Sequence, residues 1–286
     1  ERYQGGHITA TVVNPDGSLQ DSATATGVWT LVEQFTFHKA GLWPNGNTRG
    51  IFFGGNHSSP LSANIIDFIT VSSAGNVTDF GDLTSPTSRH WANSSLTRGL
   101  MGGGIAPAAT DTMEFVTISS AGNAADFGNQ QAAGYWCAGG AHSKTRSIFA
   151  EGHAGPGNNN PSNVLSYVET ATTGNAIDFG DISDSGSDMT GCCSPVRGVF
   201  FHGAKGNHDT APSDTIDYVT IASTGNATDF GNRRTSRDWA YSYAISSSVR
   251  GIVKYTGEMN YITIASTGNT TDFGDPTVGN LFGSGL

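Results

Sequence analysis

The chain has 286 residues, of which 36% are hydrophobic and 13% charged, with 39 glycines and a formal net charge of −10 at pH 7. Such a composition is poor in helix formers and rich in turns, as all-β proteins are. Nucleic acids and anionic membranes attract clustered positive charge, so the acidic balance argues against both as partners. No stretch approaches the roughly 18 apolar residues of a membrane-spanning helix, and membrane insertion is not expected.

The first 37 residues lie outside the repeats described below and predict an N-terminal arm or docking segment. Residues 7–13 alternate like a strand, and Asn-Pro-Asp-Gly at 14–17 is typical of a turn. Residues 27–35 are compatible with one or two helical turns. The sequence begins with Glu1 rather than methionine, from which we expect a processed or partial product.

One segment recurs five times in the remaining chain, at 65–84, 112–131, 164–183, 215–234 and 258–277. Each copy contains a Gly-Asn pair and an Asp-Phe-Gly triplet. The glycines of the pairs recur at intervals of 43 to 52 residues and are Gly75, Gly122, Gly174, Gly225 and Gly268. A period of this length indicates an array of supersecondary units.

Each unit predicts four short strands. In the fourth copy, residues 216–221 are rich in β-branched and aromatic residues and predict a strand. The Gly-Asn pair supplies a tight turn, and residues 227–230 form a second strand that Asp-Phe-Gly ends with a turn. An upstream segment that begins with arginine predicts a third strand in every unit, at Arg49, Arg98, Arg146, Arg197 and Arg250. A short segment before it, such as 91–96 or 239–244, can supply the fourth. Four strands in a repeat of this length are typical of a propeller blade.

The fold that follows is all-β, a five-bladed β-propeller of four-stranded antiparallel blades in residues 38–286. A solenoid coil would be shorter and a sandwich longer than one unit. The expected blades are 38–84, 85–131, 132–183, 184–234 and 235–277. Because the candidate inner strand of the first blade, at 42–46, contains a proline, we expect residues 278–286 to complete that blade and close the ring.

The residues that every copy shares are interpreted as structural. A catalytic carboxylate pair needs two different environments, whereas the five triplet aspartates recur identically; they are Asp79, Asp126, Asp178, Asp229 and Asp272. The repeated arginines predict a salt bridge or a bond to a backbone carbonyl within the scaffold, and the alternative is a ring that binds an anion.

No catalytic residue, metal site or cofactor motif is predicted, because the histidines lack metal-ligand spacing. Three cysteines do not make a disulfide framework, although Cys137 could pair with either Cys192 or Cys193.

Tryptophans are the candidate ligand-binding residues. Trp91, Trp136 and Trp239 each follow an Asp-Phe-Gly triplet, where the chain should enter the next inner strand. Aromatic faces pack against the apolar surfaces of sugars, so a carbohydrate site is one interpretation. The other is that each indole fills a gap between blades.

The repeat resembles those in virion structural proteins of tailed phages, especially phages of marine bacteria and cyanobacteria. The resemblance rests on two motifs together: Arg-Gly-apolar-Phe, and then Ile-Asp-Tyr-Val-Thr-Ile-Ala-Ser-Thr-Gly-Asn-Ala-Thr-Asp-Phe-Gly. Residues 27–44 are similar to the segment that precedes such repeats, so the resemblance covers nearly the whole chain. It implies an extracellular, virion-borne module without catalysis, in a tail fibre, a tail tip or a surface decoration. Its partners would be other virion proteins, copies of itself, or host cell-surface glycans.

Two other functions stay open at this point. One is a secreted, lectin-like propeller that binds carbohydrate, and the other is a glycosidase with a carboxylate pair in the channel. The third unit departs from the others, because Ser147 follows its arginine and its loop at 152–163 is longer. This loop is either specialised for contact or simply tolerated.

Overall fold

The structure is a computed structural model, and it describes residues 12–13, 19–20, 49–55, 62–105, 107–154, 161–205, 211–237, 242–255 and 257–276. The chain divides into two compact units, Glu1–Thr48 and Arg49–Leu286. In the first unit, β1 (Val12–Val13) pairs antiparallel with β2 (Leu19–Gln20), on either side of the predicted turn at 14–17. The helical turns expected at 27–35 lie outside the described residues.

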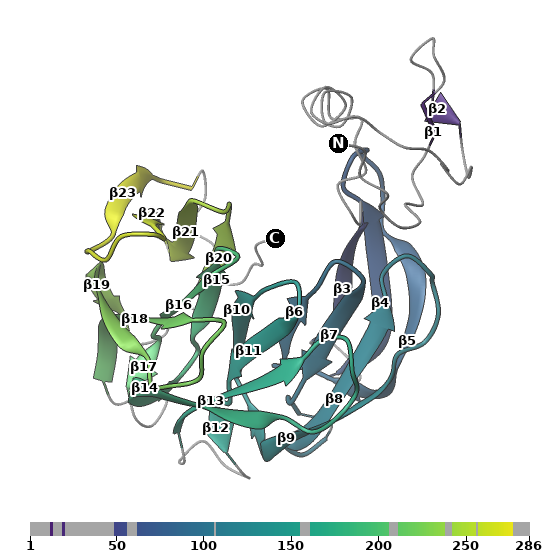
Figure 1. Cartoon of the computed structure of the whole chain (residues 1–286), viewed down its shortest axis with the longest axis horizontal. Coiled ribbons are helices and arrows are strands. Elements are labelled where there is room, and N and C mark those ends of the chain that lie inside the picture. The colour runs from purple at the N-terminus through teal and green to yellow at the C-terminus, as the bar shows by residue number, and fades with distance from the viewer. Residues whose placement is uncertain are drawn as a thin grey trace, which may run out of the picture. The chain divides into compact units, whose positions relative to one another are not determined.

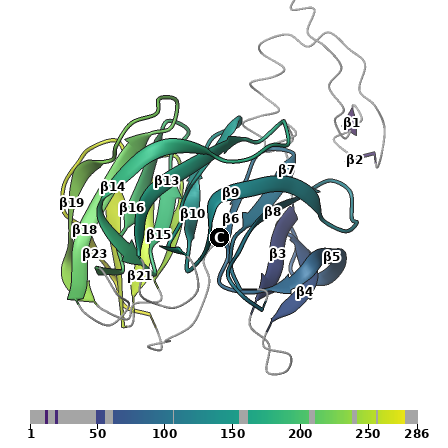
Figure 2. The ribbon, with the colours of Figure 1, turned by 90° about the horizontal axis from the view of Figure 1, so that it is seen from below.

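The second unit is a five-bladed β-propeller, and all the regular secondary structure described in it is β-strand (Figure 1). Its five small antiparallel sheets follow one another in chain order, and Figure 2 shows them from below. The first sheet contains β3 (Arg49–Gly55), β4 (Ala63–Thr70) and β5 (Thr78–Thr87). The second contains β6 (Trp91–Ser94), β7 (Arg98–Gly102), β8 (Thr110–Thr117) and β9 (Ala125–Tyr135).

The other three sheets repeat this order of strands. The third contains β10 (Ala138–His142), β11 (Arg146–Ala150), β13 (Ser162–Glu169) and β14 (Ile177–Ser187). The fourth contains β15 (Thr190–Cys193), β16 (Arg197–Phe201), β18 (Ala211–Thr220) and β19 (Thr228–Arg237). The fifth contains β20 (Tyr243–Ser246), β21 (Arg250–Tyr255), β22 (Glu258–Thr263) and β23 (Thr271–Gly274).

Two short strands connect neighbouring sheets. β12 (His153–Ala154) follows the third sheet's β11 and pairs with β9 of the second. β17 (Ala204–Lys205) pairs with β14 of the third sheet and with β18 of the fourth. These strands add main-chain hydrogen bonds between adjacent blades.

The second, third and fourth blades each pack between two others, so both faces of their central strands carry buried apolar residues. On β18, Ile216 belongs to a buried cluster that includes Val253 of the fifth sheet. Val219 points to the opposite face and joins a cluster with Ile148 and Leu165 of the third sheet. The core is therefore a series of layers between blades.

The expected turn at Asp-Phe-Gly is wrong for four blades, because β5, β9, β14 and β19 continue past the triplet. In the fourth blade, Ile216 lies opposite Gly231 and Asp217 opposite Asp229, so the phenylalanine between them occupies a β-bulge. Gly231 has a φ of 142°, and a Cβ there would lie 2.5 Å from the Gly268 oxygen. The triplet is thus a bulge that lets the next blade approach closely.

The predicted closure of the ring falls outside the described residues. Three strands of the first blade are described, and both candidates for its inner strand, 42–46 and 278–286, lie beyond them. The loop expected at 152–163 is described only at its two ends.

Candidate functional site

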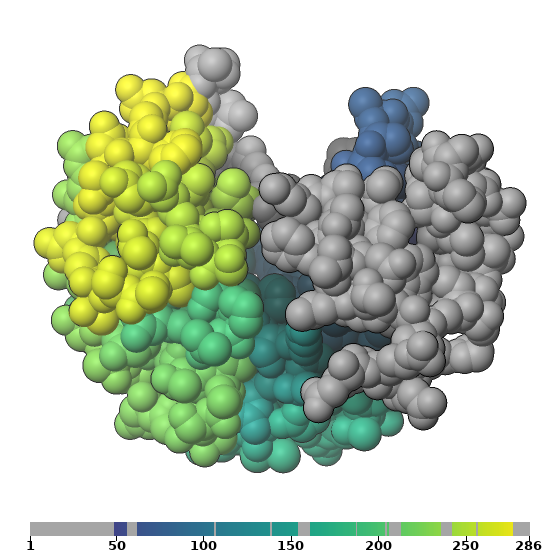
Figure 3. Space-filling model, turned by 45° about the horizontal axis from the view of Figure 1, so that its top comes forward, coloured from purple at the N-terminus to yellow at the C-terminus, as the bar shows by residue number. Residues whose placement is uncertain are grey.

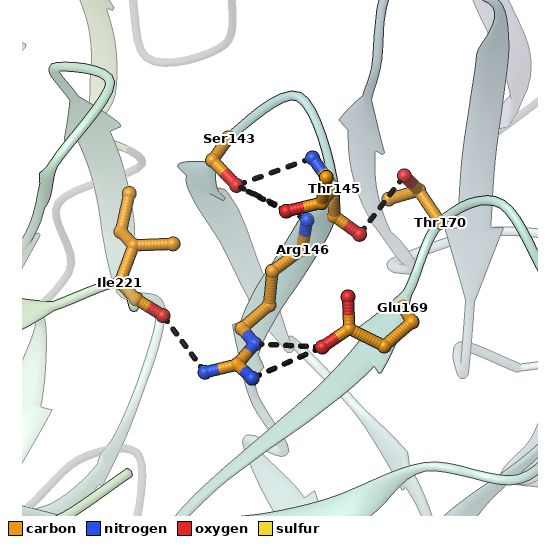
Figure 4. Close-up of polar contacts among 6 residues, drawn as sticks. All are labelled: Ser143, Thr145, Arg146, Glu169, Thr170 and Ile221. Carbon is orange, nitrogen blue, oxygen red and sulfur yellow. Dashed lines mark hydrogen bonds and ion pairs between the residues drawn. The ribbon is translucent and has the colours of Figure 1, made fainter. Parts of the chain in front are cut away.

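The repeated arginines join consecutive blades. In four of them Nη1 donates to a backbone oxygen of the following blade, at 2.9 to 3.0 Å: Arg49 to Ile118, Arg98 to Thr170, Arg146 to Ile221 and Arg197 to Ile264. Figure 4 shows the third of these bonds, where the same guanidinium also pairs with Glu169 of its own blade at 3.0 Å. The acidic partner of Arg146 is therefore not a triplet aspartate.

Each repeated arginine also covers an aromatic ring of its own blade. The guanidinium carbons lie 4.2 to 4.7 Å from the ring centroids in the pairs Arg49–Phe68, Arg98–Phe115, Arg146–Tyr167, Arg197–Tyr218 and Arg250–Tyr261. In the first four blades this cation–π contact holds the planar guanidinium in position for its carbonyl acceptor. Arginine and aromatic residue occur together in every copy of the repeat, so the sequence contained this signal.

The triplet aspartates lie on the outer strands of the blades and are exposed; they are Asp79, Asp126, Asp178, Asp229 and Asp272. Asp229 accepts a bond from the amide of Gly231 at 3.1 Å, and Asp272 forms an exposed ion pair with Arg234 at 3.3 Å. Their outer position keeps them away from the inner strands β6, β10, β15 and β20. It favours a structural role over a carboxylate pair at the axis.

Buried carboxylates, which the sequence analysis did not single out, join the second, third and fourth blades to the blade before each. In the second blade, Glu114 accepts from the Thr84 amide at 3.1 Å. The corresponding amide of Gln131 donates to Glu151 at 3.2 Å, and that of Ser183 donates to Asp217 at 2.8 Å. A single acidic residue within an apolar strand, as at positions 114 and 217, was the available signal.

Asp217 also bonds His202 and the hydroxyl of Ser183. His202 Nε2 lies 2.8 Å from Asp217 Oδ2, and Ser183 Oγ donates to the same oxygen at 2.7 Å. Burial by itself would raise the pKa of Asp217, but the bonds from His202 and Ser183 outweigh it and hold that pKa below its usual value. A hydrolytic triad needs the serine to donate to the histidine, whereas Ser183 donates to the aspartate. This group therefore joins blades.

Trp91 is a core residue rather than a ligand-binding one. Only 1% of its surface is exposed, and its indole stacks on Phe149 of the third blade with ring centroids 4.1 Å apart. Its Nε1 donates to the side-chain oxygen of Gln130. The packing alternative thus holds for Trp91, and no indole face is left for a sugar.

Trp136 lies in a different environment, in the loop before β10, and is partly exposed. The Arg89 guanidinium covers its ring at 4.7 Å, and Tyr135 and His153 lie 5.1 and 5.5 Å from it. Burial raises the pKa of Tyr135 against the opposing effect of the Arg89 cation. Burial also lowers the pKa of the neighbouring His90 to about 4, so the ring of His90 is neutral at pH 7.

Three lead-in loops, at 88–90, 136–137 and 188–189, share one unusual backbone conformation. Two residues before the inner strands β6, β10 and β15 stand Arg89, Trp136 and Asp188, with φ of 60°, 53° and 54°. Non-glycine residues with positive φ are uncommon and tend to mark functional positions. A cation, an aromatic ring and an anion occupy equivalent positions. Trp239, the third candidate, lies outside the described residues.

The cysteines in the structure are free thiols, so the alternative of a Cys137 disulfide is not realised. Burial raises the pKa of Cys192 to about 12 and that of Cys137 further, which makes both thiols unreactive. The described part of the chain holds no group of three side chains suited to a metal ion. The same residues contain no helix of the length and hydropathy needed to cross a bilayer.

Fold and contacts together define a five-bladed β-propeller whose repeated polar residues connect its blades. Neither a scan against protein-family models nor a search of curated proteins found a match to this chain.

Proposed function

We propose that the chain is a non-enzymatic structural protein of a phage virion, in a tail fibre, tail tip or surface decoration, and that it contacts its partners through the lead-in loops. The partners are other virion proteins, further copies of the chain, or the host surface. The proposal combines the sequence resemblance to phage virion repeats with the division of labour between repeated and variable residues.

The observation that carries the proposal is the set of residues at the equivalent positive-φ positions. The repeated arginines and glycines contact neighbouring blades, so they form the scaffold. Arg89, Trp136 and Asp188 differ in charge and polarity while they share a positive φ, and Arg89 also contacts the Trp136 ring of the next loop. A scaffold that holds different side chains in one geometry suits recognition, because the geometry is fixed before binding.

The test of the virion assignment uses particles of the virus that encodes the chain. Mass spectrometry of gradient-purified particles should detect it in a fixed ratio to the major structural proteins, and antibody labelling should place it on the particle surface. Its absence from purified particles, with the protein present in the infected-cell lysate, would contradict the assignment.

Carbohydrate binding is the second candidate, and Trp136 favours it. A partly exposed indole beside an arginine can combine stacking on a sugar with bonds to its hydroxyls. On a glycan array, Trp136→Ala should lose any binding that the native chain shows. Lys144→Ala is the matched control, because Lys144 is exposed in the turn after β10, at the other end of that strand. Equal binding by native protein and Trp136→Ala would exclude a sugar site at this indole.

A further inference from the structure

The first three junctions between neighbouring blades each bury a carboxyl group that the chain itself supplies. Glu114, Glu151 and Asp217 each accept a main-chain amide of the blade before, and each of them is buried. The side chain that precedes each donating amide is uncharged, and these side chains are Leu83, Gln130 and Ile182. Each of these junctions therefore encloses an acidic group beside a neutral side chain.

The junction between the fourth and fifth blades reverses this arrangement. Figure 3 shows the green atoms of the fourth blade packed against the yellow atoms of the fifth. Arg233 occupies the position that Ile182 has in the repeat and is 3% exposed. Asn260 occupies the position of Asp217 on the central strand and is fully buried. A cation thus replaces a neutral side chain, and a neutral amide replaces an acid.

The contacts of Arg233 do not balance its charge. Its Nη2 donates to the backbone oxygen of Ser213, and its guanidinium carbon lies 4.8 Å from the centroid of the Tyr255 ring of the fifth blade. Nε and Nη1 are buried and have no hydrogen-bond partner within the described residues. Glu258, whose carboxylate acts on Tyr255, accepts from the Thr235 hydroxyl instead. An arginine that is buried without an anion beside it is costly, because its charge has left water.

Two side chains of the fifth blade bring buried polar atoms to the same junction. The Tyr255 hydroxyl and both polar atoms of the Asn260 amide have no hydrogen-bond partner in the described part of the chain. Asn260 pairs with Val253, so it shares a face with Tyr255, over whose ring the Arg233 cation lies. Burial raises the pKa of the Tyr255 hydroxyl against the opposing effect of that cation. The hydroxyl therefore stays protonated at pH 7 and supplies no negative charge.

Ser242, in the loop before β20, adds a further hydroxyl. It is buried, and its Oγ has no hydrogen-bond partner among the residues that the structure describes. Its counterpart Met189 packs in one cluster with Ile182, the counterpart of Arg233, so Ser242 belongs to the same part of the fourth junction. The N–H and O–H groups of these side chains are donors, which is what an anion requires. Water molecules could accept from the donors, but they would leave the charge of Arg233 unbalanced.

We infer that the fourth junction binds a small monovalent inorganic anion, of the size and charge of chloride, among four side chains: Arg233, Tyr255, Asn260 and Ser242. The anion takes the place of the carboxyl group that the chain supplies at the other three junctions. One negative charge balances one guanidinium, and a site enclosed between two blades favours a small ion over a large one. This inference concerns the scaffold and does not depend on the proposed function.

Thermal unfolding of the full chain in chloride tests the site. The protein is first dialysed against sodium gluconate, whose anion is too large for a buried site. Chloride then replaces gluconate at constant ionic strength, so that the screening of surface charges does not change. The melting temperature should rise with chloride, by about 5–10 °C at a concentration 100 times the dissociation constant. A melting temperature that does not respond to chloride would overturn the inference.

Three variants separate the site from a general effect of salt. Arg233→Met removes the cation and should abolish the response to chloride. Arg234→Met is the matched control, because Arg234 is exposed and pairs with Asp272, and it should keep the response. Asn260→Asp places at this junction the carboxylate that Asp217 provides at the third. It should melt at a higher temperature than the native chain in gluconate and lose the response to chloride.

The Asn260→Asp variant decides the question even if Arg233→Met does not fold. If its melting temperature responds to chloride as that of the native chain does, the inference fails. Bromide then locates the ion in crystals of the native chain, where an anomalous peak should lie beside Arg233 between the fourth and fifth blades. The same peak should be absent from crystals of Asn260→Asp. Peaks confined to the exposed surface would mark adventitious ions only, and the inference would be wrong.

Discussion

The indole of Trp91 lies parallel to the ring of Phe149, with centroids 4.1 Å apart and planes inclined by 11°, so the second and third blades share one aromatic stack. Both residues are buried. Trp136, which belongs to the same group of tryptophans in the sequence, is partly exposed. The two indoles therefore separate a packing role from a surface role.

Trp91→Ala should lower the free energy of unfolding by about 3–5 kcal/mol, because it leaves a cavity between two blades and removes the donor to the side-chain oxygen of Gln130. Trp136→Ala should cost less than about half of that, since its ring is partly in water already. Urea denaturation of both variants checks the difference. Similar losses for the two variants would contradict the assignment of Trp91 to the core.

Arg197→Ala should destabilise the protein by about 1.5–3 kcal/mol, because it removes the charge-assisted bond to the Ile264 oxygen and the contact with the Tyr218 ring. The control is Arg234→Ala, which breaks only an exposed ion pair with Asp272 and should cost less than about 1 kcal/mol. Denaturation midpoints decide the comparison. A loss for Arg234→Ala as large as that for Arg197→Ala would show that burial of the bond does not matter.

Asp217 should make the protein sensitive to acid. Its pKa in the folded state is held below the usual value, so its stabilising effect is complete above the ordinary carboxyl pKa and is lost as the pH falls through the folded pKa. The melting temperature should therefore drop in this acidic range. Asp217→Asn should flatten the drop, whereas Asp126→Asn, at an exposed position, should leave it unchanged. An unchanged acid profile in Asp217→Asn would contradict the prediction.

Glu151 should have the opposite effect. Burial raises its pKa against the bonds from Ser166 and Gln131, so the unfolded chain loses this proton at a lower pH than the folded chain does. Folding then loses stability as the pH rises from the ordinary glutamate pKa to the folded one. Glu151→Gln cannot ionise and its amide oxygen can still accept both bonds, so its melting temperature at pH 7 should equal or exceed that of the native chain. The prediction is contradicted if the melting temperature of Glu151→Gln, measured relative to that of the native chain, is lower at pH 7 than at pH 4.

Several features of the candidate site could be predicted from the sequence in part. Arginines that recur at the start of a strand predicted a scaffold contact, and the structure shows the carbonyl of the following blade as the acceptor. Tryptophans that follow the triplets predicted indoles near the inner strands. The environments of these indoles could not be predicted. Trp91 is the first residue of β6 and points into the core, whereas Trp136 lies two residues before β10, in the preceding loop.

The buried carboxylates were harder to predict, since similar amides in three blades use acids from different positions. Glu114 and Asp217 lie on central strands, whereas Glu151 follows β11. Glu114 and Asp217 occupy the same position of the repeat, but Glu151 reaches the equivalent location in space from another position, which no sequence spacing reveals. The extension of four strands beyond Asp-Phe-Gly was missed for a similar reason. A glycine in a β-bulge and a glycine in a turn have the same sequence signature, and only the paired strand shows which of the two is formed.

By itself, the sequence determined the number of blades, their strand content and the apolar character of both strand faces, because these follow from local composition repeated at a regular interval. Only the tertiary structure decided which copies of a repeated residue are buried. Phe230 and Phe273 stand in the same local sequence, yet one is covered and the other is 46% exposed. The physical reason is that burial depends on the neighbouring blade, which covers Phe230 and leaves Phe273 exposed among the described residues.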